Sequence, residues 1–426
     1  MDSNVAQPAF LPKTRLVSAA RDVQVESEHL GKDPRVESHA ASGDRASQPG
    51  GGVLRAAFTS AEALSGEDCV RWHLLASHRP ESAPLVDAAW MLSWADAFAP
   101  PEPVLLGAWE AGQLVGLAAL QRVRESCGGR RLAVLQSLTN VESYRFDFLA
   151  WEGRADITDR LWRALFEARR WDLIHLEHIP QGSSTLSAGL AVARERGWRA
   201  VVEPTFLTPW RPLSRAEPWD EGLKRKFKSN LRNRERRLAS LGEVSFEVVT
   251  GQGALRKALD VFYDLEAGGW KGQGGTAVAR RQQVKRLYDR LLERAGEDMR
   301  IPILAVSGRP VAAQVLRVRG KIMFMLKTAY DEAYSAYAPG QLLTARVLQY
   351  GREDGLEALD FLADNADWKA DWAPRFLQHD RLLLFAPSLP GRYAYWVRYG
   401  LREQAKRVPG LVGLIRWLRG RRSEAA

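Results

Sequence analysis

The chain has 426 residues, enough for two domains plus tails, and its 46% hydrophobic and 26% charged residues are ordinary for a soluble globular protein. Its two cysteines, Cys69 and Cys127, are too few and too isolated for a disulfide framework or a cysteine-based zinc site, which favours a reduced cytoplasm. Met1 to Lys13 lacks the apolar core of a signal peptide, and no apolar run is long enough to span a membrane. The net charge of +10 is compatible with anionic partners as well as with simple solubility.

The first globular segment begins at Val53, because residues 1–52 have few aromatic side chains and mixed charge and are expected to be disordered. Leu85 to Phe98 shows the spacing of an amphipathic helix, which Pro100 and Pro101 end. A hairpin is predicted next, from Val104–Trp109 and Leu114–Leu120, followed by strands at Ala133–Leu138 and Phe146–Leu149. A helix at Ile157–Arg170, a strand at Leu173–Leu176 and a helix at Leu186–Arg196 complete this segment.

A second segment repeats this order of elements after a proline-containing crossing. Trp210 to Asp220 carries Pro212 and Pro218 and is predicted to connect the two halves. The next elements are a basic helix, a strand, two helices and a hairpin, predicted at Glu221–Leu241, Val244–Val249, Leu255–Leu265, Gln282–Arg294, and Ile301–Val306 with Val311–Val318. Arg381 to Phe385 is predicted to close the sheet. The shared order is not accompanied by a residue-level repeat.

Residues 322–363 predict one βαβ unit. The apolar run from Ile322 to Leu326, before Lys327-Thr328-Ala329-Tyr330, is typical of a buried strand. A helix is predicted from Gln341 to Gly351, and a second strand from Leu356 to Ala363. The crossover between the two strands is expected to be right-handed.

The turn into that helix has the composition of an anion site. Pro339 fixes its own φ, and Gly340 tolerates a close approach by a ligand, so the pair suits a sharp turn into a helix. The first turn of a helix leaves backbone N–H groups without intrahelical partners. These groups favour an anion, and a pyrophosphate fits such a site.

Three motifs lie close together around this unit: Tyr337-Ala338-Pro339-Gly340 followed by Leu342-Leu343, then Leu359-Asp360-Phe361-Leu362, then Trp368-Lys369 with Trp372. Together they resemble a bacterial branch of the GNAT acetyltransferase superfamily, some members of which are encoded beside cellulose- and exopolysaccharide-synthesis genes. Leu265 to Gly272 and the basic helix Lys224 to Leu241 also match the pattern of that branch. The resemblance runs from Val53 to Phe385 and includes neither tail. Family members usually have Ser where this chain has Ala338, and often Tyr in place of Trp368.

The resemblance implies an α/β protein of two tandem GNAT-like halves, each a mixed sheet with flanking helices. It divides residues 53–385 into an N-terminal half (53–210) and a C-terminal acetyltransferase half (211–385). Composition adds a disordered segment before them (1–52) and a basic amphipathic tail after them (386–426). Acetyl-CoA or another acyl-CoA is the implied co-substrate. The implied reaction is direct attack of an acceptor amine (less favoured, a hydroxyl) on the thioester. The implied acceptor is a small molecule or a saccharide of exopolysaccharide or cell-envelope metabolism.

The same resemblance assigns the groups that hold the acyl-CoA. Pro339, Gly340 and Gln341 would hold the pyrophosphate at the start of the helix. Backbone N–H groups near Thr328 and Ala329 would polarise the thioester carbonyl.

Proton transfer and acceptor binding fall to a second set of residues. Tyr330 or Tyr337 would donate a proton to the departing thiolate, and Asp360 or Glu266 would take one from the acceptor. The implied acceptor side comprises Trp270, Lys271, Trp368 and Trp372.

Asp360 and Lys369 admit two interpretations. An aspartate in an apolar strand is either part of a structural salt bridge or a desolvated carboxylate with a raised pKa that acts as a base. Lys369, nine residues downstream, would pair with it or reach the thioester carbonyl. A structural or positioning role is the favoured interpretation of the pair.

Metal and nucleophile chemistry find no support in the sequence. His175-Leu176-Glu177-His178 lacks the HExxH spacing of a zinc protease, and on a strand its two histidines would face opposite ways. No GxSxG turn is present for a serine nucleophile. We therefore expect no metal cofactor.

Two basic segments suggest anionic partners. The basic helix from Lys224 to Arg237 is interpreted as lining a groove that binds CoA phosphates or an acidic polysaccharide. Nucleic acid is disfavoured because the basic residues are not interleaved with the aromatic residues of a nucleic-acid recognition motif. Gly391 to Arg422 alternates basic with apolar residues, which fits a helix on an anionic membrane and, equally, a helix packed on its own domain. The expected location is the cytoplasm, with peripheral attachment to the inner membrane as an option.

Two other functions remain open. A related tandem-GNAT family transfers amino acids from aminoacyl-tRNA to peptidoglycan precursors, in which case the basic helix would face RNA. A non-catalytic accessory protein of a membrane polysaccharide synthase is the second alternative.

Overall fold

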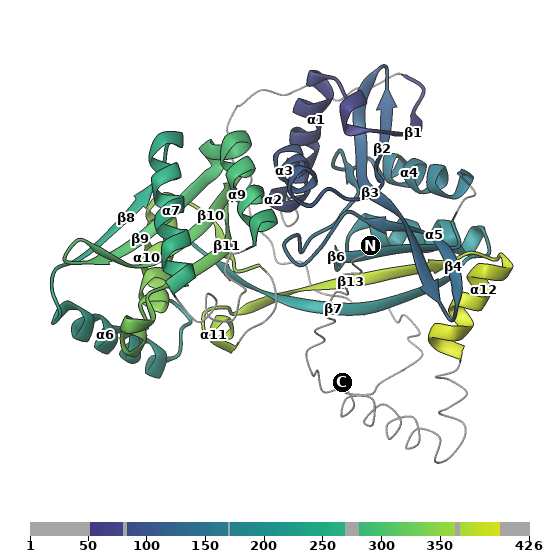
Figure 1. Cartoon of the computed structure of the whole chain (residues 1–426). Coiled ribbons are helices and arrows are strands. Elements are labelled where there is room, and N and C mark those ends of the chain that lie inside the picture. The colour runs from purple at the N-terminus through teal and green to yellow at the C-terminus, as the bar shows by residue number, and fades with distance from the viewer. Residues whose placement is uncertain (1–51, 80–82, 169–170, 269–280, 363–366, 401–426) are drawn as a thin grey trace, which may run out of the picture. The chain divides into compact units, whose positions relative to one another are not determined.

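The computed structural model describes residues 52–79, 83–168, 171–268, 281–362 and 367–400 (Figure 1). Everything described below belongs to one compact unit within residues 49–426. The expected disorder of residues 1–52 therefore concerns a segment that, apart from Gly52, lies outside the described residues.

The described residues form a mixed α/β fold, as the sequence predicts, around one sheet. Its strand order is β1-β2-β3-β4-β6-β13-β7-β12-β11-β10-β9-β8, with β5 paired to β3. The strands are β1 (Arg55–Thr59), β2 (Pro103–Glu110), β3 (Gln113–Cys127), β4 (Arg130–Ser137), β5 (Leu149–Ala150), β6 (Leu173–Pro180), β7 (Arg199–Pro212), β8 (Val244–Val249), β9 (Met299–Val306), β10 (Arg309–Arg319), β11 (Ile322–Tyr330), β12 (Ala358–Asp360) and β13 (Arg375–Phe385).

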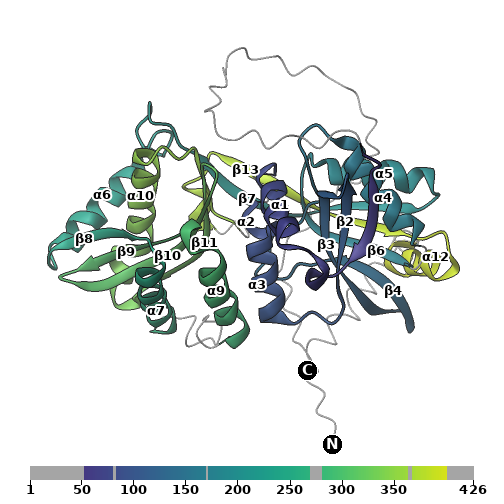
Figure 2. The ribbon, with the colours of Figure 1, turned by 90° about the horizontal axis from the view of Figure 1, so that it is seen from above.

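Helices cover both faces of this sheet. They are α1 (Gly66–Ser77), α2 (Ala83–Val86), α3 (Ala88–Phe98), α4 (Ala155–Glu167), α5 (Ser184–Glu195), α6 (Arg225–Ala239), α7 (Gln252–Gly268), α9 (Gln282–Ala295), α10 (Pro339–Glu353), α11 (Asp367–Ala370) and α12 (Leu389–Tyr395), with 3₁₀ turns η1 (Ala61–Ala63), η3 (Gly296–Asp298) and η4 (Glu332–Tyr337) and a π-helical turn η5 (Trp396–Gly400). Over strands β8 to β11, α6 and α10 lie on one face and α7 and α9 on the other (Figure 2).

The helix predicted from Leu85 to Phe98 is divided in two at Asp87. The Asp87 carboxylate accepts a hydrogen bond from the Trp90 N–H and so caps α3. It also forms a buried ion pair with Arg317 of β10, at 2.6 Å. Apolar periodicity continues across the break, so the sequence pattern alone did not reveal it.

Strand β7 was not predicted from the sequence. Its 14 residues, Arg199–Pro212, include Trp210, which was assigned to the crossing between the halves, and they pair with β13 along that strand's whole length. Three prolines, Pro204, Pro209 and Pro212, argue against a strand when only the sequence is read, because each lacks a ladder donor. β13 also pairs with β6, so a strand near the C-terminus completes the sheet of the N-terminal half.

The predicted βαβ unit is confirmed. β11 and β12 are parallel, with Ile322 opposite Ala358, and α10 connects them. β11 is longer than predicted and continues to Tyr330. The Leu356–Ala363 strand is shorter, with only Ala358–Asp360 in β12.

The first part of the predicted tail belongs to the fold. Tyr393 on α12 donates a hydrogen bond to the Gly128 carbonyl at 2.8 Å, and Arg398 pairs with Glu125 at 2.7 Å. Ala394 is fully buried. The rest of the predicted tail, residues 401–426, lies outside the described residues. Within the described ranges, no helix has both the length and the apolar composition needed to cross a bilayer.

Candidate active site

The parallel strands β11 and β12 separate partway along their length. Their pairing ends at Phe324 opposite Asp360, yet β11 continues to Tyr330. After β12 the chain turns at Leu362, which has a φ of 47°. The pairing of β11 with β10 shifts register at Leu326, an extra residue that makes a β-bulge on β11. The result is a wedge between two strands, with a bulge on one wall.

A pocket of about 510 Å³ occupies this wedge. The residues that line it are Met325, Leu326, Lys327, Thr328, Tyr330, Ser335, Ala338, Gly340, Gln341, Phe361, Trp368 and Lys369. Six of the predicted site residues, taken from separate motifs, therefore meet at one pocket: Thr328, Tyr330, Gly340, Gln341, Trp368 and Lys369. Its volume lies within the usual range for small-molecule sites.

The start of α10 forms one end of the pocket. Ala338 is left-handed, with a φ of 48°, and its carbonyl accepts hydrogen bonds from the N–H groups of Gln341 and Leu342. Pro339 has no N–H, so Gly340 supplies the first N–H of the helix, and no backbone acceptor for it is found in the described chain. A Cβ on Gly340 would meet only the Tyr330 ring, at 3.6 Å. The absence of a side chain here therefore favours a ligand rather than the packing of the protein.

A buried relay of hydrogen bonds fixes that first turn. Gln314 of β10 donates to the Thr344 hydroxyl at 2.9 Å, and this hydroxyl donates to the Gly340 carbonyl, also at 2.9 Å. Gln314 lies opposite Thr328 in the ladder. The helix start is thus held by the side chain of a residue whose backbone lies opposite the β11 wall of the pocket.

Asp360 lies behind the pocket wall. It is fully buried, and its Oδ2 is 2.6 Å from Nη2 of Arg145, which comes from the N-terminal half. Its Oδ1 accepts the Leu362 N–H at 2.8 Å. Burial raises the pKa of Asp360, an effect that Arg145 opposes. Because the carboxylate is held by these partners and does not line the pocket, the geometry favours the structural interpretation over the base.

Lys369 lines the pocket, and its positive charge opposes the rise that burial causes in the pKa of Asp360. Its ammonium group donates hydrogen bonds to the carbonyls of Phe361 and Leu362, at 3.0 and 2.7 Å. Lys369 therefore stabilises the turn after β12 while contributing positive charge at the wall. Trp368, beside it, packs edge-on against Phe361 with ring centroids 6.2 Å apart.

The two candidate tyrosines differ in position. Tyr330, the last residue of β11, lines the pocket. Tyr337 does not belong to the lining; its ring lies 5.2 Å from the Arg237 guanidinium of α6. A neighbouring α6 residue, Arg234, hydrogen-bonds the Gln341 side chain. The basic helix thus lies against the rim of the pocket.

Other predicted residues lie away from the lining. Ala329 is buried in β11, and Glu266 is buried at the end of α7. Trp372 is 0% exposed and packs edge-on against Phe227, so core packing accounts for it and its assignment to the acceptor side is corrected. Trp270 and Lys271 lie outside the described residues.

Sequence reasoning missed several polar residues of this region. Arg145 and Glu142 follow β4 in the N-terminal half, and Lys327 was treated only as the end of a strand. The Glu142 carboxylate pairs with Lys327 at 2.8 Å and with Arg281 at 2.9 Å. These ion pairs join residues that are far apart in the sequence, so no local sequence pattern predicts them. Ser335, in the turn before α10, was also overlooked.

One cluster has the composition of a metal site. The donor atoms of His73, Asp87 and Asp298 lie within 4.8 Å of one another. However, Arg317 contacts both carboxylates, at 2.6 Å and 3.2 Å. A guanidinium group thus lies where a cation would be bound, and the cluster is explained as an ion-pair network.

Comparisons with known proteins support these observations. Residues 225–370 match the family described as "Acetyltransferase (GNAT) domain", a range that contains β11, α10, β12 and the whole pocket lining. No curated protein sequence matches the chain.

Among solved structures, FemX aligns over 77% of this chain and 98% of its own, with 12% identity and a TM-score of 0.51. A tandem GNAT protein from the clavulanic acid biosynthesis pathway aligns over 79% and 100%, with 16% identity and a TM-score of 0.42. The C-terminal domain of a putative lysylphosphatidylglycerol synthetase from Agrobacterium fabrum aligns over 73% and 92%, with 15% identity and a TM-score of 0.44. The structural likeness to FemX establishes a shared fold, and the family match identifies a GNAT acetyltransferase domain at residues 225–370 of this mixed α/β chain.

Proposed function

We propose that the protein transfers an acyl group from acyl-CoA to an acceptor amine, in the pocket between β11 and the turn after β12. The observation that carries this proposal is the pocket itself: a cavity of about 510 Å³ with a helix start at one end and a β-bulge along its wall. The Gly340 N–H, for which the described chain offers no backbone acceptor, suits the pyrophosphate of CoA at that helix start.

The residues of the pocket have complementary tasks in this scheme. When bound, acyl-CoA supplies the activated thioester. Gly340 and Gln341 hold its phosphates at the start of α10, and backbone N–H groups of β11 between the Leu326 bulge and Ala329 stabilise negative charge on the carbonyl oxygen. The acceptor nitrogen bonds to the carbonyl carbon as the C–S bond breaks, and Tyr330 gives its phenolic proton to the departing sulfur.

The acceptor must lose a proton during this reaction. Among the described residues that line the pocket none is acidic, and Asp360 and Glu142 are both bound in buried ion pairs. We therefore assign Asp360 to positioning. Of the two predicted proton acceptors Glu266 remains; it is buried at the end of α7 outside the pocket lining, so we assign it to the acceptor side of the site rather than to the thioester. Trp270 and Lys271 follow Glu266 in the sequence and remain assigned to the acceptor side.

For the acceptor we propose an amine on a saccharide or another small molecule of exopolysaccharide or cell-envelope metabolism. Two features support an acidic or phosphorylated acceptor: the basic helix α6 lies against the pocket rim, and Lys327 and Lys369 line its wall. These charges attract anions during encounter.

Calorimetry with acetyl-CoA tests the acyl-CoA assignment. The full chain is expected to bind acetyl-CoA with one site per chain and to release measurable heat. Aminoacyl-tRNA is the competing donor. The acyl-CoA proposal is wrong if three results are found together. The protein binds tRNA tightly, it does not bind acetyl-CoA, and replacing the α6 residues Lys226, Arg232 and Arg236 by Gln abolishes tRNA binding.

A second proposal concerns the C-terminal residues and the membrane. Residues 401–426 contain Lys406, Arg407, Arg416, Arg419, Arg421 and Arg422 among apolar residues. Each basic side chain near an anionic surface contributes about 1 kcal/mol. Deleting residues 401–426 should therefore weaken cosedimentation with phosphatidylglycerol vesicles and leave acetyl-CoA binding unchanged. Equal sedimentation of the full and truncated chains would exclude a membrane role for this segment.

A further inference from the structure

We propose that residues 139–148 of the N-terminal half act on the acyl-CoA pocket of the C-terminal half, with Glu142 and Arg145 as positioning residues for its two walls. This inference rests on the function proposed above and extends it, because it makes the N-terminal half part of the acyltransferase site. Neither residue lines the pocket, and each acts through a partner on one of the two separating strands.

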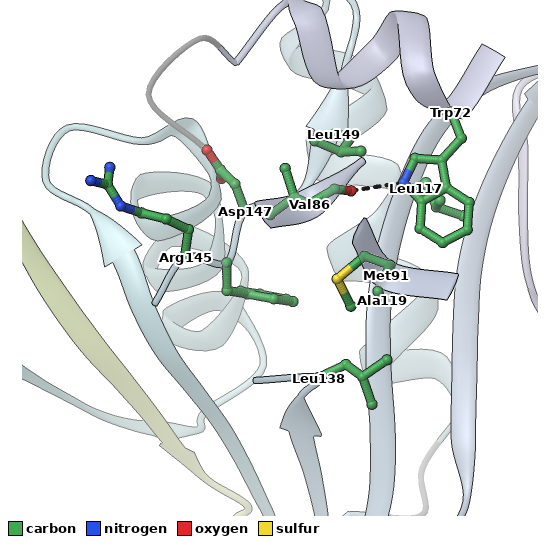
Figure 3. Close-up of a pocket in the computed structure, with 10 residues that line it drawn as sticks. Trp72, Val86, Met91, Leu117, Ala119, Leu138, Arg145, Asp147 and Leu149 are labelled. Atoms are coloured by element: carbon green, nitrogen blue, oxygen red, sulfur yellow. Dashed lines mark hydrogen bonds between the residues drawn. The ribbon is translucent and has the colours of Figure 1, made fainter. Parts of the chain in front are cut away.

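The segment itself is fixed within the N-terminal half. The Asp147 carboxylate accepts hydrogen bonds from the hydroxyls of Ser183 and Thr185 and from the Phe148 N–H. Figure 3 shows Arg145 and Asp147 at one side of a cavity of about 10 Å³, whose other labelled lining residues are apolar. A void of that size holds one water at most, so the segment is closely packed on its core.

Two buried ion-pair systems connect this fixed segment to the C-terminal half. Glu142, with its side chain 3% exposed, lies 2.8 Å from Lys327 on β11 and 2.9 Å from Arg281. Arg145 lies 2.6 Å from Asp360 on β12, and both side chains are fully buried.

The partners of Glu142 and Arg145, Lys327 and Asp360, lie beside the point where the two pocket walls diverge. Lys327 belongs to the pocket wall, and Asp360 directly precedes Phe361, which forms the opposite wall. Pairing between the two strands ends at Phe324 and Asp360. One rigid segment therefore holds both strands beside the point where they separate. The distance between the walls is set by Glu142 and Arg145 as well as by the sheet.

Stability alone does not account for these pairs. Ion pairs in a protein interior gain little over well-packed apolar residues, because desolvation offsets most of the Coulomb attraction. What they add is a defined position for each charged group. Burial lowers the pKa of Lys327, but Glu142, with a smaller contribution from Tyr144, raises it overall, so the ammonium group stays charged at the pocket wall.

The variant Glu142→Gln tests the inference. It removes the countercharge of Lys327 without altering a residue that lines the pocket. We expect the Kd for acetyl-CoA, measured by calorimetry on the full chain, to rise by about tenfold. Glu142→Asp keeps the charge one bond further back and should give an intermediate Kd.

Glu110→Gln is the matched control. Glu110 is also a buried carboxylate of the N-terminal half, paired with Arg154 at 3.2 Å, and it does not line the pocket. It should reduce thermal stability about as much as Glu142→Gln while leaving the acetyl-CoA Kd unchanged.

The outcomes separate this inference from the proposed function. If the wild type binds no acetyl-CoA, the proposed function fails. If the wild type binds and a folded Glu142→Gln binds equally well, the positioning role is wrong and the proposed function stands. If Glu142→Gln does not fold, Glu142→Asp decides: wild-type affinity overturns the role, and a several-fold weaker affinity supports it.

Discussion

Replacing Gly340 by Val is expected to abolish CoA binding, with a loss of more than about 100-fold in affinity, while the protein stays folded. Gly340 lines the pocket at the start of α10, and a side chain there would project toward the pyrophosphate. Within the protein the new Cβ would meet only the Tyr330 ring at an ordinary contact distance of 3.6 Å. Calorimetry with CoA, beside a thermal melt, measures the two effects separately.

Gly253→Val is the control for this substitution. Gly253 is the second residue of α7, as Gly340 is of α10, and a Cβ there would meet nothing within 4 Å. Both variants should have similar helix propensity effects, on the order of 0.5 kcal/mol. Only the Gly340 variant should lose CoA. Equal CoA affinity in both variants would show that the pyrophosphate lies elsewhere.

Asp360→Asn should destabilise the fold by about 3–5 kcal/mol and weaken acetyl-CoA binding at the same time. The substitution leaves the buried guanidinium of Arg145 without its countercharge, 2.6 Å away in the native protein. A catalytic base would behave differently, because its loss removes turnover and spares the fold. Urea unfolding monitored by far-UV circular dichroism gives the free energy, and calorimetry gives the affinity.

Two further variants serve as controls for the Asp360→Asn result. Glu357→Gln breaks the Lys321–Glu357 pair just before β12, which has a similar distance of 2.7 Å but is 67% and 63% exposed. It should cost less than about 1 kcal/mol. Arg145→Met combined with Asp360→Leu removes both charges and should recover most of the stability but not the affinity. An Asp360→Asn protein with full stability and full affinity would exclude any positioning role for this carboxylate.

The sequence predicts the elements of the pocket well because each carries a local signal. The apolar run of β11 and the Pro339-Gly340 turn are local patterns, and the structure keeps both elements. β7 was missed because its prolines contradict strand propensity, and only pairing with β13 along its length reveals it. Local propensity therefore predicted the strand–turn–helix part of the site and failed where distant pairing decides the structure.

The charged partners of the site could not be predicted for the same reason. Arg145 lies 215 positions from Asp360 in the chain, and nothing near either residue specifies the other. For Lys369, nine residues after Asp360, the sequence left two options open: pairing with Asp360 or reaching the thioester carbonyl. In the structure Lys369 binds the backbone carbonyls after β12. The motif match placed Trp372 near the site in the sequence, but it did not show that the Trp372 ring is buried in the core.

A crystal structure of the full chain with CoA would show whether the wedge between β11 and β12 binds CoA. We expect the pyrophosphate to accept a hydrogen bond from the Gly340 N–H at the start of α10, and the thiol end to lie beside the Leu326 bulge of β11. CoA bound at any other surface, or a wedge between β11 and β12 that stays empty at saturating CoA, would contradict this expectation.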